Sequence, residues 1–593
     1  MLTALVLTTL YFQTNLYDPF NSPKSWILLL AGGWLIGYIY AFRKILLTDN
    51  DLKFSYFLVI FFIFSLTVVT IFTDAKFVAV FGDTQRRNGY LSYISLSIIF
   101  IASIIFIRIF NVVRVFSISI WIGLILSIYA LLQSTGNDFV DWNNPYNQVI
   151  GTLGNPNFAG AVMAIIGVIL FSIVFINAFT FYHRAAAAII SLLLFYLIYQ
   201  TNARQGLLSY IIGVGFFFTI YLIGKRKKIG FFFATIGVFL SVFGVLGMLQ
   251  VGPLEKYLYK SSVSVRGYYW RAGVEMFTNN PVIGIGMDRY GAYFKEYREA
   301  EYSITYGYSI TSSNAHNTFI QFFATGGLLL GLSYLLLNIF ILKCAISGLK
   351  KHSDNSRLLL AGVFAGWVAF HAQSLVSIDN VGISIWGWVL GASIIGISVS
   401  SSDNPLADQK NYMGSRIRID LKRLAISTLA TVITIAIVSI AYRGEADAYK
   451  SRIVLNAQDQ NIRQAFYNLQ LRVINKSLID PTYKISSALS LAQNGFSTEA
   501  LSALKDVYDS DPRNLEAMRF LALTHESLNQ IAEANYYRIQ IAKYDEWNAE
   551  NYLEIGKNYK KLGDLANSNN MLQKILSFAP NDSIASQAKI DLG

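Results

Sequence analysis

The sequence predicts an all-α protein in two parts, a polytopic α-helical membrane domain followed by a soluble α-helical repeat domain. Three observations support this prediction. Only 14% of the 593 residues are charged and 54% are hydrophobic, whereas soluble proteins carry about 25% charged residues. Long apolar runs fill residues 1–442, and residues 443–593 are polar with a helical repeat period. We therefore expect the membrane domain at 1–442 and the soluble domain at 443–593.

The membrane part contains about 12–13 candidate spans, most of them near the ~17–25 residues that a tilted helix needs to cross a bilayer. The first, at 2–15, is short. Two runs are separated only by Thr201-Asn202-Ala203-Arg204 and predict a helical hairpin. The runs lie at 2–15, 26–42, 54–73, 91–109, 114–133, 157–178, 185–202, 205–224, 229–250, 318–343, 357–377, 381–399 and 424–442.

Lysine and arginine are concentrated in one of the two alternating sets of short loops, for example at Lys225-Arg226-Lys227-Lys228. Such a bias predicts that this set is cytoplasmic. The other set, which holds Arg86, Arg87 and Arg204, is then on the outer side. A long loop translocates largely regardless of its charge, so we expect the large loop 250–317 and the soluble domain outside as well. The net charge of +12 reflects the cytoplasmic loops, and nucleic-acid binding is not expected.

Residues 443–593 contain an internal repeat. Asp511-Pro512-Arg513-Asn514 recurs as Asp545-Glu546-Trp547-Asn548, 34 residues further on, and again near Ala579-Pro580-Asn581-Asp582. Over residues 480–593 this period resembles the tetratricopeptide repeat, a helix–turn–helix unit. Stacked units of that kind form a concave binding surface. The domain is therefore either a platform for a protein partner or a solubilising cap without one.

Two outer arginines are candidates for anion binding. Arg204 lies at the rim of the predicted hairpin, where a charge either binds an anion or extends to the interface. Arg266 shares one helical face with Trp270, Val274 and Phe277, whereas Arg271 lies roughly 140° around the helix. This helix suits the membrane interface, and Asn279-Asn280-Pro281 is expected to end it.

His316 stands directly before an apolar span, and histidine is the usual general base near neutral pH. A helix cap by Ser313 or Asn314 explains the surrounding polar residues but not the histidine. Within the chain, His371 and Asp379 are further candidates because ionisable groups at membrane depth are usually functional.

Several features have weaker implications. The turn Gly284-x-Gly286 resembles a phosphate cradle, although chain geometry alone explains such a turn more often. A short helix containing Tyr290 follows it, and Gly154-Asn155-Pro156-Asn157 predicts a helix cap. The single cysteine excludes an intrachain disulfide framework, and the chain has no Walker loop and no H-E-x-x-H zinc motif.

Together these motifs resemble the O-antigen ligase and O-antigen polymerase superfamily, which includes bacterial protein O-oligosaccharyltransferases. The resemblance covers residues 20–400. The motifs that carry it are GTLGNPNFAG at 151–160, TNARQG at 201–206, SVRGYYWR at 264–271, NPVIGIG at 280–286 and AHNTFIQ at 315–321. Gln205 departs from the usual glycine, and Tyr290 from the usual phenylalanine.

The resemblance implies a multi-pass glycosyltransferase of the bacterial cytoplasmic membrane. It would move a glycan from undecaprenyl diphosphate to an acceptor hydroxyl at the outer face, without a metal or other cofactor. Arg204 and Arg266 would hold the diphosphate, and His316 would be the base. The remaining residues implied for substrate binding are Arg271, Asn317, Gly284, Gly286, Tyr290 and Asn157.

The acceptor stays open at this stage. It can be the lipid A core, a protein or a growing glycan, so ligase, polymerase and protein O-oligosaccharyltransferase are alternatives. A polysaccharide transporter or flippase would predict broken or charged helices at the bilayer midplane and pseudo-symmetric halves, and neither is evident. A scaffold that only anchors the repeats would need one or a few spans.

Overall fold

The computed structural model describes residues 1–142, 149–248, 261–399, 421–454, 460–476 and 478–592. All regular secondary structure in these ranges is helical. Ten of the helices are long and apolar enough to cross a membrane. The prediction of an all-α, polytopic membrane protein is therefore confirmed, with fewer spans in the described residues than the 12–13 expected.

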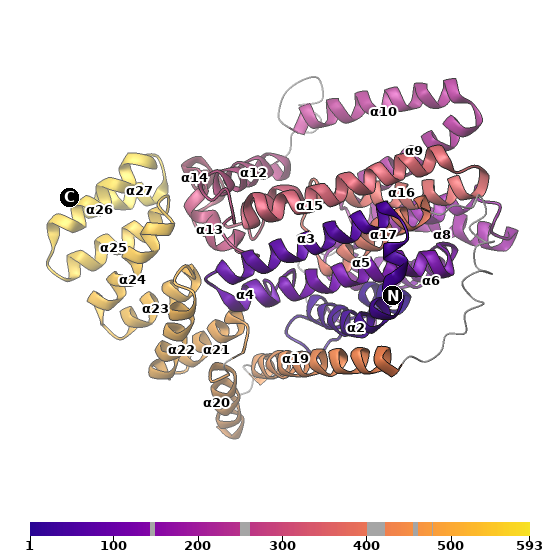
Figure 1. Ribbon diagram of the computed structural model, residues 1–593. Coiled ribbons are helices and arrows are strands. Elements are labelled where there is room, and N and C mark those ends of the chain that lie inside the picture. The colour runs from indigo at the N-terminus through magenta and orange to yellow at the C-terminus, as the bar shows by residue number, and fades with distance from the viewer. Residues whose placement is uncertain (143–148, 249–260, 400–420, 455–459, 477, 593) are drawn as a thin grey trace.

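The helices before the repeats form a bundle with a smaller helical layer at one end (Figure 1). The bundle contains α1 (Leu2–Leu10), α2 (Asn21–Phe42), η1 (Arg43–Leu47), α3 (Asn50–Phe72), α5 (Tyr90–Phe110), α6 (Val113–Ser134), α7 (Pro156–Ile173), α8 (Phe181–Gln200), α9 (Arg204–Lys225), α10 (Lys227–Met248), α15 (Thr318–Lys351), α16 (Asp354–Ser374), α17 (Val381–Ser398) and α19 (Leu421–Val454). The end layer contains α4 (Lys76–Phe81), η2 (Gly151–Leu153), α12 (Ser261–Asn279), α13 (Tyr290–Tyr297) and α14 (Ala300–Tyr306).

Three expected spans differ from the ten that the structure supports. The run at 2–15 forms only the nine-residue helix α1, which at 1.5 Å per residue is too short for a hydrocarbon core of ~30 Å. The run at 357–377 forms α16, a helix whose polar residues at both ends lower its hydropathy. The run at 229–250 forms α10 and extends beyond the described residues.

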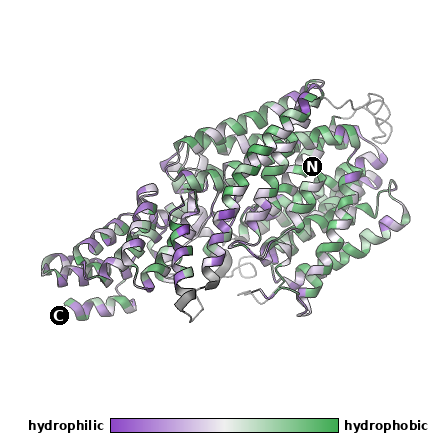
Figure 2. Cartoon of the chain, turned by 90° about the horizontal axis from the view of Figure 1, so that it is seen from below, coloured by the Kyte–Doolittle hydropathy of each residue, from purple (hydrophilic) through white to green (hydrophobic). Residues whose placement is uncertain are grey.

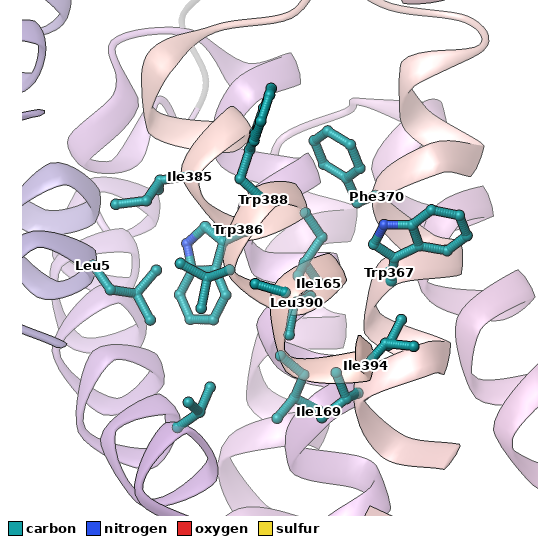
Figure 3. Close-up of a cluster of buried hydrophobic side chains, with 14 of the residues drawn as sticks. Leu5, Ile165, Ile169, Trp367, Phe370, Ile385, Trp386, Trp388, Leu390 and Ile394 are labelled. Atoms are coloured by element: carbon teal, nitrogen blue, oxygen red, sulfur yellow. The ribbon is translucent and has the colours of Figure 1, made fainter. Parts of the chain in front are cut away.

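The core of the bundle surrounds α17. Every residue in the most apolar window of this helix is buried, as is 89% of the α7 window. Figure 3 shows the packing of Trp386 and Leu390 of α17 with Ile165 of α7 and Trp367 of α16. A helix that is apolar on all sides fits only such a central position, which explains why α17 shows no polar face.

Loops that were predicted to lie on the same side of the membrane lie at the same end of the bundle. At one end Arg86 pairs with Asp288 at 2.6 Å, and the amide of Asn317 donates to the Leu375 carbonyl. At the other end Lys343 pairs with Asp51 at 2.9 Å. Each contact joins loops that were predicted to share a side, so the relative grouping agrees with the charge bias. Which end faces the outside stays a prediction.

The chain after α19 is a stack of helix pairs with the expected period. The first helices of the pairs begin at 481, 515 and 549, 34 residues apart, and the second helices begin at 497, 531 and 565. The helices are α20 (Gln460–Ile474), α21 (Pro481–Gln493), α22 (Ser497–Ser510), α23 (Leu515–Ser527), α24 (Ile531–Tyr544), α25 (Ala549–Lys561), α26 (Leu565–Phe578) and α27 (Ser583–Leu592). This confirms a 34-residue helical repeat, while the tetratricopeptide assignment stays a prediction.

The junction between the two parts is helical. α19 runs without interruption from Leu421 to Val454 and packs along α2, so the expected boundary at 442/443 falls inside a helix. Hydropathy changes across this junction, from mainly apolar residues in the bundle to mainly polar residues in the repeats (Figure 2).

Candidate functional site

The face of α12 that packs against the rest of the site differs from the face that the sequence predicted. Tyr269, Ala272 and Met276 are buried against Phe294 and its neighbours, whereas Val274, which was expected to share the face of Arg266, is 50% exposed. The helix ends at Asn279, as predicted. This difference leaves Arg266 half-buried at the edge of the packed face.

The Gly284-x-Gly286 turn is bound to α15 through its backbone. The amides of Ile285 and Gly286 donate to the carbonyls of Ala324 and Thr325, both at 3.0 Å, and the Gly284 amide donates to Asn280. A Cβ on Gly284 would lie 2.5 Å from the Gly326 nitrogen. These amides are occupied, so the expectation that Gly284 and Gly286 bind substrate is replaced by a role in closing the loop onto α15.

His316 is held in an uncommon backbone conformation at the start of α15. Its φ is +50°, a value that non-glycine residues adopt rarely and often at functional sites. Its amide donates to the Asn314 side chain at 2.8 Å, and its ring stacks on Tyr269 with centroids 5.2 Å apart. The ring nitrogen Nδ1 is buried without a hydrogen-bond partner among the described residues. Buried polar atoms are nearly always paired, so this nitrogen is available for a ligand.

Asn317, not Ser313 or Asn314, caps α15. Its side-chain oxygen accepts from the amides of Phe319 and Ile320 at 3.0 and 3.1 Å. The Asn317 side chain thus makes hydrogen bonds to the start of α15 and to the Leu375 carbonyl, and its expected role in substrate binding stays a prediction.

The electrostatic surroundings keep the imidazole neutral. Burial, followed by the nearby cations Arg266 and Arg86, lowers the pKa of His316 from 6.5 to about 3. A neutral imidazole has a lone pair that can accept a proton. The same cations make it a weak base until an anion offsets them.

Arg266 is a half-buried cation whose pKa is lowered, chiefly by desolvation. Its guanidinium donates to Gln205 Oε1 at 3.4 Å, and Gln205 Nε2 donates to Ser377 at 2.9 Å. No carboxylate among the described residues pairs with Arg266. A desolvated cation of this kind favours an anionic ligand.

Arg204 lies beside this chain of contacts as the first residue of α9. Its side chain is exposed and has no ion pair to a described residue. The preceding Ala203 provides no side-chain cap for the helix, so the partial positive charge at this N-terminus is uncompensated. The Arg204 guanidinium and the helix end thus favour an anion at the same place.

A small cavity of about 30 Å³ adjoins His316, with room for one or two water molecules. Arg86, Asp288 and Asp379 lie on its walls. Arg86 donates to Asp288 and to the carbonyl of Ser313, so it ties the α4–α5 turn to the loop that carries the histidine. Burial raises the pKa of Asp379.

Three further predicted residues lie apart from the imidazole. Arg271 points away and pairs with Glu299 at 2.5 Å on the surface. Tyr290 is fully buried, and its hydroxyl donates to the Tyr269 carbonyl at 2.6 Å, so it supports the loop instead of lining a substrate pocket. Asn157 is exposed in the first turn of α7, which packs against the α8–α9 turn through Gly160 and Gly206.

The geometry above agrees with a comparison to known families. A family model described as O-Antigen ligase matches residues 189–335. The match runs from α8 to the first half of α15 and includes Arg204, Arg266 and His316. It supports an O-antigen ligase or polymerase type of membrane enzyme. No curated protein matches the chain.

Sequence reasoning missed several residues that the structure brings to the site. Gln205 was noticed only as a departure from a glycine, yet it connects Arg266 to the turn after α16. Arg86 was read only as a charge in an outer loop, and Asp288 was not considered. The adjacent pair Arg86-Arg87 in a charge-poor loop set was the available signal. The described residues contain no group of three or more His, Cys, Asp or Glu side chains placed to hold a metal ion.

Proposed function

We propose that this protein is a glycosyltransferase that moves a glycan from undecaprenyl diphosphate to an acceptor hydroxyl, at the outer face of a bacterial cytoplasmic membrane. One observation carries the proposal: the His316 imidazole, with an unpartnered nitrogen, lies beside a half-buried arginine that has no carboxylate partner among the described residues. That combination offers a proton acceptor next to an anion site. The family match over 189–335 supports the same class of enzyme.

In the proposed reaction the acceptor oxygen attacks the anomeric carbon of the donor sugar. A bond forms between that carbon and the acceptor oxygen, and the bond from the carbon to the diphosphate oxygen breaks. The acceptor proton moves to the His316 imidazole, and the electron pair leaves with the diphosphate. Arg266 and Arg204 neutralise the charge that develops there, with fixed guanidinium donors that suit phosphate oxygens.

Binding of the donor also prepares the base. Arg266 is one of the two cations that lower the pKa of His316. A diphosphate on Arg266 offsets this cation and raises the pKa of the imidazole. His316 is therefore a stronger base when the donor is in place, although burial, the largest cause of its lowered pKa, continues to act.

The test is glycan transfer from a purified lipid-linked donor by full-length variants. Arg204→Ala and Arg266→Ala should each lower kcat/KM by roughly 10²–10³-fold, as for the loss of one transition-state donor. His316→Ala should lower it by roughly 10²–10⁴-fold.

Two matched variants serve as controls. Arg271→Ala removes an arginine from the same helix as Arg266, but one that faces Glu299 on the surface. His183→Ala removes an exposed histidine from α8. Both should retain transfer, and near-normal rates in all three site variants would refute the enzymatic proposal.

The acceptor is not assigned by these residues. A lipid A core, a growing glycan and a protein hydroxyl all use the same base and the same diphosphate site. Within the proposal, ligase activity is the first candidate, and polymerase or protein O-oligosaccharyltransferase activity are its variants. Mass analysis of which molecule gains the glycan separates them.

A further inference from the structure

A second, larger cavity lies between the end layer of the bundle and the repeats. Its volume is about 450 Å³, against about 30 Å³ beside His316, and it falls within the ~300–1,000 Å³ typical of ligand pockets. Four parts of the chain form its walls: α4 with the turn after it (78–84), the segment 288–311, the start of α21 (480–482) and the start of α23 with the turn before it (511–519). Neither the fold nor the proposed donor site accounts for it.

Buried ion pairs fix the opposing walls. The Arg289 guanidinium binds Asp511 through two contacts of 2.6 and 2.5 Å, and both side chains are about 5% exposed, at 4% and 6%. Lys295 contacts Asp545 at 3.2 Å. Bidentate, desolvated pairs of this kind are geometrically specific. The cavity is therefore a defined space between two docked surfaces.

The cavity is also lined by solvent-exposed polar groups that are not used for docking. The Glu516 carboxylate, the Ser309 and Thr311 hydroxyls and the Arg519 guanidinium line the cavity. None of the four side chains has a hydrogen bond or ion pair to a described residue. Desolvation by the surrounding protein raises the pKa of Glu516, and Arg519 opposes this shift. The cavity thus presents a carboxylate, a cation and two hydroxyls to whatever enters.

The cavity adjoins the catalytic loop. Asp288 lies on the walls of both the large cavity and the small one beside His316. Arg86 binds Asp288 and also the Ser313 carbonyl, three residues before the histidine. A chain seated in the large cavity is therefore separated from the imidazole by the Arg86–Asp288 pair.

We propose that this cavity binds the carbohydrate of the acceptor and that Glu516 and Arg519 recognise its hydroxyl groups. The inference rests on the proposed function, since it assigns the second substrate of the same site. Carboxylate and guanidinium groups accept and donate hydrogen bonds to vicinal hydroxyls, while Leu515 and Ala292 offer small apolar contacts to the faces of sugar rings. An acyl chain would instead require an apolar lining.

The first test is binding of a defined probe to the full-length protein in detergent. The probe is the core oligosaccharide that mild acid releases from the lipid A of the host's own glycolipid, which is the acceptor in the ligase reaction, and calorimetry measures its affinity. Glu516→Ala and Arg519→Ala should each weaken binding about tenfold or more, as expected for a lost hydrogen bond to a charged group. Glu533→Ala and Arg472→Ala, which remove exposed charges of the repeats outside the cavity, should bind like the wild type.

The second test separates this inference from the proposed function. In transfer assays, Glu516→Ala and Arg519→Ala should raise the KM for the acceptor and leave the KM for the donor unchanged, whereas His316→Ala should abolish transfer but retain oligosaccharide binding. Wild-type protein that does not bind the oligosaccharide, or cavity variants with an unchanged acceptor KM, would overturn the inference. If the wild type transfers no glycan from the lipid-linked donor but binds the oligosaccharide, and the cavity variants lose this binding, the proposed function fails and the carbohydrate site stands.

Discussion

At the scale of single residues, the site is built from polar side chains that lack some of the hydrogen-bond or ion-pair partners they need. His316 has a strained φ and an unpartnered nitrogen, and Arg266 is desolvated without a carboxylate. Elsewhere in the same loop comparable residues are satisfied, as Arg271 is by Glu299 and Tyr290 by a backbone carbonyl. Unsatisfied groups raise the energy of the empty site, and a bound donor would recover that energy.

The first prediction concerns pH. In the free protein the pKa of His316 is about 3, well below 6.5, so the imidazole is unprotonated from neutral pH down to about pH 4. Because kcat/KM reports groups of the free enzyme, its acid limb should lie well below pH 6.5. The acid limb of kcat should lie at higher pH, since the bound diphosphate offsets Arg266 and raises the pKa of the imidazole.

Steady-state rates at saturating acceptor, measured between pH 4 and 9, check this prediction. Circular dichroism at each pH shows whether the protein stays folded. An acid limb of kcat/KM at about 6.5, or one that coincides with that of kcat, would contradict the assigned environment of His316.

At the scale of elements, a break in α15 positions the loop that carries His316. Gly327 has φ +59° and ψ −158° inside this helix, a conformation essentially restricted to glycine. The break lets the amides of Leu328 and Leu329 donate to the carbonyls of Pro281 and Val282. The loop after α12 is thereby bound to the same helix whose first turn carries His316, and α15 serves as the common support.

The second prediction follows from this break. Gly327→Ala should destabilise the protein by at least about 2 kcal/mol, because alanine does not tolerate this conformation and its Cβ would collide with the backbone of Val282. Thermal unfolding of the purified protein measures the effect. Gly215→Ala in α9 is the matched control, since nothing lies within 4 Å of the added Cβ; equal melting temperatures for the two variants would contradict the role of the break.

At the scale of the whole molecule, the repeats are docked onto the end of the bundle that carries the site (Figure 1). An aspartate before the first helix of each successive pair binds a residue of the end layer. The contacts are Arg87–Asp480 at 2.7 Å, Arg289–Asp511 at 2.5 Å, Arg298–Asp545 at 2.6 Å and Tyr308–Asp582 at 3.0 Å. The periodicity of the repeats therefore serves an intramolecular purpose: it holds the loop between α12 and α15 in place.

The third prediction tests this docking. The side chains of Arg298 and Asp545 are fully buried, at 0% and 1% exposure. Arg298→Ala leaves the buried Asp545 carboxylate with Lys295 as its remaining cation, so its charge is only partly compensated. Such a change costs about 3–5 kcal/mol, so the variant should unfold at lower temperature and expose the tyrosine-rich 298–317 segment to chymotrypsin. Arg271→Ala, which breaks an exposed pair, should cost less than about 1 kcal/mol. Chymotrypsin resistance equal to the wild type in Arg298→Ala would exclude a docking role.

The fourth prediction concerns sidedness. Because the repeats and the His316 loop share one end of the molecule, protease added to spheroplasts should digest the repeats if the charge bias is read correctly. Immunoblotting with an antibody against residues 549–592 provides the measurement, with the 350–357 loop at the opposite end as the protected control. Protection of the repeats would place the site on the cytoplasmic side and remove the proposed donor.

Much of the architecture was readable from local patterns. The apolar runs predicted most of the spans, the 34-residue period predicted the helix pairs, and the helix end at Asn279 and the cap at Asn155 follow from local residue types. The identity of His316, Arg266 and Arg204 as candidates came from the same kind of reading. Local patterns gave a wrong prediction where the length or polarity of the helix decides whether it can span the membrane, as for the nine-residue α1.

The sequence by itself determined the helical membrane architecture, the repeat period and the residue types of the candidate site, because hydrophobic periodicity and helix capping act over a few residues. Which polar groups already have hydrogen-bond or ion-pair partners within the protein, and which remain able to bind a ligand, follows only from the tertiary contacts. The Gly284-x-Gly286 amides are occupied by α15, Gln205 connects Arg266 to Ser377, and the repeat aspartates bind the catalytic end. These contacts join residues up to several hundred positions apart, and no local pattern encodes such pairing.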